Sequence, residues 1–321
     1  FYDGTFAINS KINDDNELKF FLYRSSDNFS LASKNDYSYQ NSGASATWES
    51  RITDSLGFNL GFAMSDYRFN NIDRNNPTES FVQDYRISHY ETRADFTFTR
   101  LKNQRIEFGA SNVWYDLDRG DILPHGEESK RRPVNLGKEL GLENSLYISD
   151  EIDLHPRLTL LLGVRFSIYQ YLGPDTVNLY KEGLPKDIYS ITGTENFGPL
   201  EKVSAHHGIE PRAAVNFRIS NNTSVKASYN RMKQYLFMLS NTVAISPTDQ
   251  WKLTDYHLSP PRADQVSVGF YQDFDEAGIN FSVEAYRKWV RHVVEYRDWV
   301  DFISGDPVEM QVLDGDQDVS G

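Results

Sequence analysis

Residues Arg157 to Tyr169 read RLTLLLGVRFSIY, and this stretch decides the fold. From Leu158 to Ile168 every second side chain is large and apolar. Most of the residues between them are small, polar or charged, and Leu161 is the exception. An alternation of period two is typical of an extended strand, whose successive side chains point to opposite faces. The stretch therefore predicts a β-strand with one apolar face and one polar face.

The same period recurs along the chain. Clear examples are segments 43–51, 57–65, 89–99 and 212–219, with shorter ones at 266–270 and 281–285. We find no comparable segment with the three-to-four-residue spacing of apolar side chains that an amphipathic helix requires. The sequence therefore predicts an all-β chain of about twelve strands.

The connections between these strands are of two kinds, and the two kinds alternate. Short polar turns are predicted at 13–17, 53–56, 101–104, 154–157, 220–223 and 275–279, and long loops at 27–42, 70–83, 118–142, 173–208, 241–261 and from 299 onward. An antiparallel meander with this alternation has its tight turns at one end and its long loops at the other. Short periplasmic turns and long extracellular loops are typical of an up-and-down transmembrane β-barrel.

Two soluble all-β folds are the alternatives. A propeller would show a repeat of roughly 40 to 50 residues, and the sequence has none. A soluble sandwich, such as a glycan-binding module, also alternates apolar and polar residues, but it gives no reason for long loops at one end only. In a sandwich, Leu158, Leu160, Leu162 and Phe166 would meet a second sheet, whereas in a membrane barrel they would meet lipid.

The composition limits the classes of function. The mean hydropathy is -0.58, and no apolar run approaches the roughly 18 residues that a membrane helix needs. A barrel is compatible with these values, because its strands alternate lipid-facing and lumen-facing side chains. The formal net charge of -13 argues against a nucleic-acid partner, since such proteins usually carry a basic face. The absence of cysteine excludes disulfides, thiol catalysis and cysteine-bound zinc.

Aromatic residues make up 14% of the chain, and several stand where an apolar stretch ends on the long-loop side. These residues are Tyr67, Phe69, Trp114, Tyr115, Tyr169, Tyr171 and Tyr235. Aromatic rings at the border of an apolar band are typical of the girdle that a barrel places at the membrane surface. We therefore expect these side chains to face the membrane interface. The alternative is that they are ordinary strand-forming residues.

Four motifs in the second half of the chain resemble the TonB-dependent outer-membrane receptors. Segments 146–151 (LYISDE) and 158–166 (LTLLLGVRF) are similar to a paired-strand signature of that family. Segment 210–215 (EPRAAV) resembles its Pro-Arg strand start, and 258–269 (LSPPRADQVSVG) resembles its loop-to-strand junction. Segment 283–296 is similar to the following strand, especially in receptors of the Bacteroidetes type. The order and spacing of the four agree with the family, and the first half of the chain matches in pattern.

The resemblance implies a bacterial outer-membrane location and TonB-dependent import of a scarce nutrient: a siderophore, a vitamin, an oligosaccharide or a peptide. Receptors of this family have a 22-stranded barrel around an N-terminal plug. Residues 1–321 start without a methionine and stop in a polar segment, so we expect about twelve strands of that barrel, without the plug and the closing strands. The implied partners are outer-membrane lipid and lipopolysaccharide, the TonB complex through the missing plug, the nutrient ligand and a surface lipoprotein. Nucleic acid is not among them.

Charged residues on the polar faces of the strands are candidates for the barrel interior. They are Arg93, Asp95, Arg105, Glu107, Arg165, Arg212 and Arg218. We expect them to line a wet lumen or to contact the plug through charge-assisted hydrogen bonds. The alternative is a solvated lining without a specific partner.

Ligand capture is expected at the long-loop rim, where loops supply aromatic and polar side chains. The candidates are Tyr171, Tyr235, Trp251, Tyr256, Trp289 and Trp299. Their rings could stack on the face of a sugar or a siderophore. The alternative is that they pack loops against one another.

Two charged segments are candidates for ion contacts. In the tail, Asp314, Asp316 and Asp318 alternate with other residues, and one turn could direct their carboxylates at a structural Ca²⁺. Val319 stands where a calcium loop prefers glycine, so a solvated acidic loop is the alternative. Segment 130–132 (Lys-Arg-Arg) could contact lipopolysaccharide phosphates. No other cofactor is expected.

The sequence contains no Gly-x-Ser-x-Gly, no glycine-rich phosphate loop and no His-Glu-x-x-His. We therefore do not expect an enzyme. An outer-membrane barrel enzyme of the protease or lipase type is the alternative, since such a site is assembled in space and leaves no short motif.

Overall fold

The computed structural model describes residues 1–31, 34–240, 249–275, 278–298, 300 and 305–321. Its main element is an antiparallel sheet whose strands follow one another in chain order. These strands are β1 (Tyr2–Asn13), β2 (Asn16–Leu31), β3 (Asn35–Thr53), β4 (Leu56–Asp73), β5 (Phe81–Phe98), β6 (Gln104–Asp118), β9 (Lys138–His155), β10 (Leu158–Leu172), β13 (Lys202–Arg218), β14 (Thr223–Lys233), β17 (Arg262–Phe274), β18 (Ile279–Tyr296) and β19 (Val312–Ser320). No helix in the described ranges is long and apolar enough to cross a membrane.

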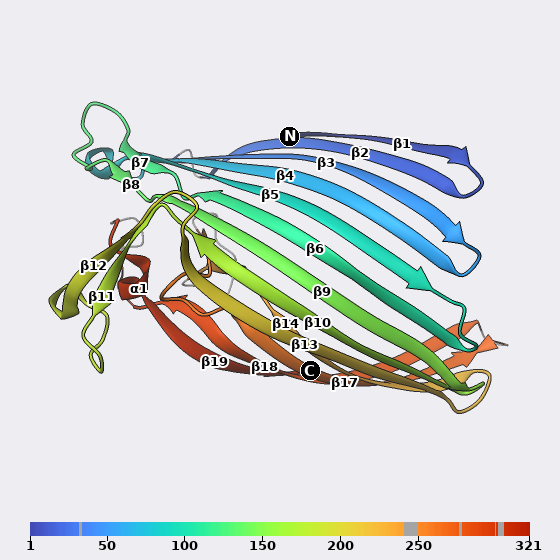
Figure 1. Cartoon of the computed structure of the whole chain (residues 1–321). Helices are drawn as coiled ribbons and strands as arrows, with labels where there is room; N and C mark the ends of the chain where they lie inside the picture. Colours follow the sequence, from blue (N-terminus) through green and yellow to red (C-terminus); the bar gives the residue numbers. More distant parts are fainter. Residues whose placement is uncertain (32–33, 241–248, 276–277, 299, 301–304) are drawn as a thin grey trace.

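The sheet curves into an open arc (Figure 1). β1 and β19 are its two ends and, over the described residues, do not pair with each other. A strongly twisted sheet of this many strands curls, and in a barrel the curl closes on itself. The predicted fold, an antiparallel up-and-down barrel present in part, is confirmed.

The two ends of the strands differ as the sequence predicts. Tight turns join consecutive strands at one end, and the connections at the other end carry the remaining elements. These are β7 (Asp121–Pro124), β8 (Val134–Asn135), β11 (Asp175–Tyr180), β12 (Ile191–Phe197), β15 (Leu236–Leu239), β16 (Gln250–Leu253), the 3-10 turns η1 (Pro77–Glu79) and η2 (Ile188–Ser190), and the short helix α1 (Val308–Gln311). Figure 1 shows β7, β8, β11, β12 and α1 gathered at this end.

The first predicted long loop, 27–42, is mostly strand. β2 and β3 stay paired far beyond the apolar band, and Asp27 lies opposite Tyr39. The rings of Phe29 and Tyr37 lie 5.2 Å apart across the two strands. Serine and asparagine in this segment indicate a loop by composition, but aromatic pairs across the strands stabilise the continued ladder.

The apolar faces of the strands point out of the arc and are exposed. The exposed fractions of Leu162, Val164 and Phe166 are 46%, 40% and 40%. Over the described residues, the other sheets are the two-stranded β11–β12 and β15–β16, which belong to the long-loop end. In the part of the chain that the structure describes, no second sheet covers the apolar face, so the soluble-sandwich alternative is wrong.

The aromatic residues predicted as a membrane girdle lie mostly on the inner face, so that prediction is wrong for all of them except Trp114. The six others belong to, or pack against, a single buried cluster: Tyr67, Phe69, Tyr115, Tyr169, Tyr171 and Tyr235. Tyr169 and Tyr171 follow the inward-facing Arg165 at steps of two and therefore share its face. Trp114 lies opposite Tyr90, a residue that is 38% exposed on the outer face. The main core of the described chain is this inner aromatic cluster at the long-loop end.

Candidate functional site

The inner face of the arc contains a cavity of about 640 Å³ next to the aromatic cluster. Side chains of β5, β6, β9, β10 and β13 form its wall, among them Arg93, Glu107 and Arg165. They point inward because they alternate with the outward apolar residues of the same strands. The polar stripe of each strand thus faces a shared chamber.

Four of the predicted interior residues line this cavity: Arg93, Glu107, Arg165 and Arg212. Two others lie on the same face nearer the tight turns. There Asp95 accepts a hydrogen bond from Arg93 Nε at 2.8 Å, and Arg105 pairs with Glu107 at 2.6 Å. Arg218 lies at the turn end of β13 and is exposed. The interior charges are therefore largely paired with one another across short distances.

A buried polar network lies where the cavity meets the aromatic cluster. Arg165 Nη2 donates to Glu143 Oε1 at 2.5 Å. Ser167 Oγ donates to Glu210 Oε1 at 2.9 Å and shares a hydrogen bond of 2.8 Å with the Tyr235 hydroxyl. These contacts restrain Glu143, Ser167 and Glu210, although Arg165 Nε is buried without a hydrogen-bond partner among the described residues. The inward direction of Ser167 follows from that of Arg165, but Glu143 and Glu210 are brought in by the pairing of different strands.

Three of the predicted ligand-binding aromatics meet in the cluster, where they are buried. The exposed fractions of Tyr171 and Tyr235 are 4% and 3%, and Trp251 packs against them half-buried. Tyr235 stacks on Tyr169 with ring centroids 4.6 Å apart. In this conformation the rings pack the molecule and present no face to a ligand.

The other three candidates lie apart from the cluster. Tyr256 is 44% exposed, and its ring meets the edge of His257 with centroids 5.0 Å apart. Trp289 is on the outward face of β18, with the Arg287 guanidinium 5.4 Å from its ring centroid. Trp299 lies outside the described residues. Tyr256 is therefore the predicted aromatic that a ligand at the rim can reach.

The segment between β14 and β17 folds over the inner face of the arc. Residues 234–240 and 249–258 of this segment are here called the strap. They contain β15 and β16, which pair with each other. β16 contacts β6 and β9, whereas β15 contacts β18. The strap therefore crosses the inside of the arc, and Tyr235 and Leu236 form the wall of the cavity on this side.

A buried ion cluster anchors the strap to β9. Lys252 Nζ lies 2.9 Å from Glu139 Oε1 and 2.6 Å from Asp255 Oδ2. The side chains of Lys252 and Glu139 are only 4% and 6% exposed. Glu139 also accepts a hydrogen bond from the Leu253 amide at 2.9 Å, and Arg119 Nε lies 3.7 Å from it.

The charges of this cluster stabilise one another against burial. Burial acts to lower the pKa of Lys252, but Asp255 and Glu139 outweigh it and raise that pKa. Burial acts to raise the pKa of Asp255, but Lys252 and the amides of Leu258 and His257 hold that pKa below its usual range. Both groups are therefore charged at neutral pH. Sequence reasoning missed the cluster because Lys252 and Glu139 are far apart in the chain and form no motif.

A second polar junction holds the β11–β12 hairpin against the strap and α1. His257 Nε2 lies 2.9 Å from the Asn178 carbonyl oxygen, and the Tyr180 hydroxyl donates to Glu309 Oε1 at 2.8 Å. Lys186 Nζ donates to the His257 carbonyl at 3.2 Å. Burial lowers the pKa of His257, although the charge of Glu309 acts in the opposite direction. The imidazole is therefore neutral at neutral pH.

Acid should loosen this junction. The pKa of His257 is lower in the folded state than in the unfolded state. The stability that the neutral imidazole gives to the junction is therefore complete above the unfolded pKa of about 6.5. This stability is lost as the pH falls toward the folded pKa. We expect the amides of β11 and β12 to exchange hydrogen faster at about pH 5.5 than at about pH 7.5, after correction for intrinsic rates. The His257→Gln variant should lose this difference. An equal pH dependence in both proteins would assign the effect to another group.

The acidic tail forms a strand, and the turn predicted there is wrong. Asp314, Asp316 and Asp318 lie on β19, which pairs with β18. Asp318 forms an ion pair with Arg287 at 2.6 Å, and Asp314 lies 2.9 Å from His292 Nδ1, so side chains of β18 compensate the acidic charge. Among the described residues, no group of three or more His, Asp or Glu could hold a metal ion. The structural calcium stays a prediction.

Known proteins share this architecture. The family described as TonB dependent receptor-like, beta-barrel, matches residues 1–317. Similar solved structures include a double mutant of the Serratia marcescens hemophore receptor HasR (16% identity, TM-score 0.66), the copper transporter OprC (10%, 0.66) and the alcaligin outer-membrane receptor FauA of Bordetella pertussis (12%, 0.58). The alignments cover 92%, 99% and 99% of this chain and 46%, 48% and 47% of those chains. Comparison with curated proteins gave no match.

At these identities the solved structures show the fold alone, and the chain spans about half of their length. The family match shows membership of the family as well as the fold, because it extends over residues 1–317. It agrees with the outward apolar faces and the one-sided long loops. The chain belongs to the TonB-dependent receptor family and forms part of the β-barrel that these receptors place in the bacterial outer membrane.

Proposed function

We propose that this chain supplies part of the barrel wall and the extracellular loops of a receptor that imports a scarce nutrient with energy delivered through TonB. The observation that carries the proposal is the polar cavity on the inner face, which the strap covers on the long-loop side. A passive pore functions with an open lumen, whereas a covered lumen suits a receptor that binds first and transports in a separate, energy-driven step. The family comprises receptors and transporters, which supports this role over an enzymatic one.

The nutrient is a siderophore, a vitamin, an oligosaccharide or a peptide. The solved relatives are described as a hemophore receptor in complex with hemophore and heme, a copper transporter and an alcaligin receptor. In this chain, Tyr256 at the rim would offer an aromatic face to the ligand. Arg165 and Arg212 would contact a plug through charge-assisted hydrogen bonds. Lipopolysaccharide and a surface lipoprotein are further proposed partners.

Uptake by cells that carry the full-length receptor tests this function. Deleting the receptor should abolish accumulation of one radiolabelled nutrient from the four classes, and a plasmid copy should restore it. Collapsing the proton gradient should stop accumulation and leave surface binding intact. Undiminished accumulation without the gradient, or in cells lacking TonB, would indicate a passive channel and contradict the proposal.

A further inference from the structure

The outward face of β14, β17 and β18 carries four arginines at the long-loop side of its apolar band. Cross-strand pairing places Arg231 opposite Asp264, and Asp264 opposite Trp289. In the next row toward the loops, Arg262 lies opposite Arg291. Arg287 lies one row closer to the tight turns, opposite Val266. We call Arg231, Arg262, Arg287, Arg291 and Trp289 the arginine patch.

The patch faces out of the barrel. Val266, Val268 and Phe270 alternate on the same face of β17 as Asp264, and their side chains are 40%, 51% and 38% exposed. From Phe274 to Val266 the strand climbs about 20 Å along the barrel axis, at roughly 3.3 Å per residue and a tilt of about 40°. The apolar band of a membrane barrel is about 25 Å tall. The arginine patch therefore lies at the level of the lipid headgroups, in the leaflet next to the long loops.

The charge of this face differs from that of the chain and from that of other strands at a similar level. The whole chain has a net charge of -13. On the outward face of β4, β5, β6 and β9, toward the loops, the three cations Arg68, Arg86 and Lys138 are outnumbered by the four carboxylates Asp66, Asp84, Asp116 and Asp118. The patch has four arginines against the three carboxylates Asp264, Asp316 and Asp318. It is therefore the more cationic of these two outward surfaces.

Hydrogen bonds inside the patch leave donors free. Arg231 binds Asp264 through Nε at 2.7 Å, and Arg262 approaches the same carboxylate through Nε at 3.4 Å. Arg231 also bonds to the Tyr229 hydroxyl, which leaves part of its five N–H donors available. Arg262 makes no second ion pair, and Arg291 makes none, with any residue that the structure describes. Arg287 is different, because its Nε and Nη2 both donate to Asp318 at 3.1 and 2.6 Å. Arg287 therefore positions Trp289, and the other three arginines can bind an anion.

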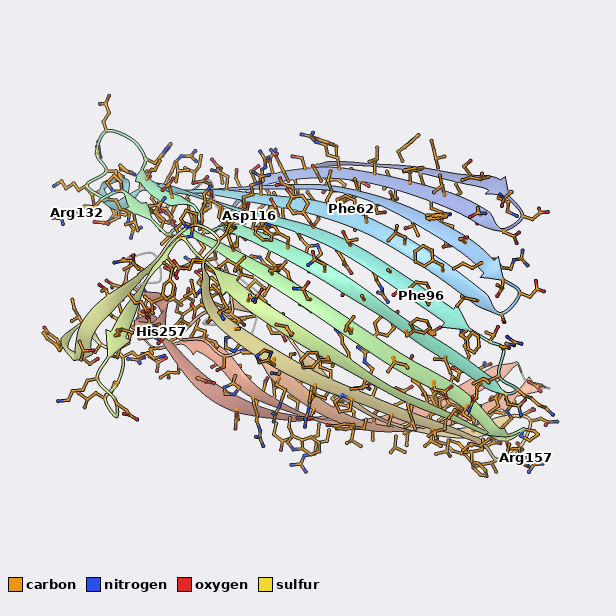
Figure 2. All side chains as sticks on the ribbon, viewed as in Figure 1. Phe62, Phe96, Asp116, Arg132, Arg157 and His257 are labelled. Carbon is orange, nitrogen blue, oxygen red and sulfur yellow. The ribbon has the colours of Figure 1, made fainter. Side chains whose placement is uncertain are left out.

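We propose that the arginine patch binds a phosphate group of the lipid A part of lipopolysaccharide. The planar guanidinium matches phosphate oxygens with two parallel hydrogen bonds. Trp289, which is 39% exposed beside the arginines, suits the border between acyl chains and headgroup. Segment 130–132, which the sequence suggests for the same contact, is less suitable, since Arg132 lies at the far long-loop end (Figure 2). The proposal rests on the outer-membrane location and is independent of the imported nutrient.

Binding of lipopolysaccharide to the purified full-length receptor in detergent tests the site. Wild type should bind lipopolysaccharide and should be stabilised by it against heat, while enzymatically dephosphorylated lipopolysaccharide should bind roughly tenfold more weakly or less well still. The double variant Arg231→Gln and Arg262→Gln should show the same loss with intact lipopolysaccharide. Arg68→Gln with Arg86→Gln is the matched control, because these two arginines also face outward toward the loops but share Asp66.

Three outcomes would overturn the proposal. The first is equal binding of phosphorylated and dephosphorylated lipopolysaccharide. The second is equal loss in the patch variant and in the matched control. The third is equal affinity for phosphatidylglycerol micelles, which would indicate a general anionic-lipid surface. The shift in electrophoretic mobility on heating distinguishes folded from unfolded barrel, so a variant that fails to fold is recognised, and the single variant Arg291→Gln then replaces it.

Discussion

Replacing Leu162 with arginine should sharply reduce the amount of folded receptor in the outer membrane. Leu162 is 46% exposed on the outward face of β10, in the middle of its apolar stripe. An arginine at this position would place a charge against acyl chains, and near the bilayer midplane of a barrel that costs about 2–4 kcal/mol. The measurement is the fraction of full-length receptor in the outer-membrane fraction that is protease-resistant and shifts in mobility on heating.

Leu161 is the matched control for this change. It is the same residue type one position earlier, and its side chain lines a second inner cavity, of about 480 Å³. An arginine at Leu161 would meet water and neighbouring polar groups, so Leu161→Arg should leave most of the receptor folded. Equal losses for Leu161→Arg and Leu162→Arg would show that β10 does not separate lipid from lumen, and the outward face would need reassignment.

The alternation that predicts this result also predicts most of the barrel. Period two identifies the strands and their faces because one face meets lipid and the other meets polar groups, so a slip of one residue would reverse every side chain. The same rule shows that Tyr169 and Tyr171 share the face of Arg165. The girdle prediction rests on the aromatic type of these residues, whereas the alternation of the strand determines the direction in which they point. Their inward position was predictable from the sequence.

Strand length and loop structure were not predictable in this way. Segment 27–42 has a loop-like composition, and its pairing depends on contacts between β2 and β3 that no local pattern encodes. The acidic tail forms a strand because its carboxylates meet Arg287 and His292 on β18. Such compensation requires knowing which strands are neighbours.

The candidate site also has a part that is predictable from the sequence and a part that is not. The sequence indicates that Arg93 and Arg165 lie on polar faces, and the register then brings them to one cavity. The strap could not be inferred, because Lys252 and Glu139 come from distant segments. Apolar packing alone does not account for the position of the strap, because an ion pair between Lys252 and Glu139 joins the strap to β9. That contact gives the strap its own sensitivity to mutation.

Replacing Lys252 with methionine should release the strap from β9 while the barrel stays folded. Methionine keeps much of the side-chain length and removes the charge, so Glu139 and Asp255 would be left as buried carboxylates without their cation. Removing one partner of a buried ion pair typically lowers the stability by about 3–5 kcal/mol. If the loss is confined to the strap, amide exchange at Leu253 and Thr254 should accelerate roughly hundred- to thousandfold. Hydrogen exchange with mass spectrometry on the full-length receptor measures this directly.

An exposed ion pair with the same distance tests whether burial causes the effect of the Lys252 substitution. Lys19 lies 2.6 Å from Glu49, as close as Lys252 lies to Asp255, but the Lys19 side chain is 36% exposed and that of Lys252 only 4%. Lys19→Met should therefore leave exchange in the strap unchanged. The triple variant with Lys252→Met, Glu139→Gln and Asp255→Asn should exchange more slowly than Lys252→Met alone, because it removes the unpaired charges as well. Wild-type exchange in Lys252→Met would mean that the stack of Tyr169 and Tyr235 holds the strap without the ion cluster.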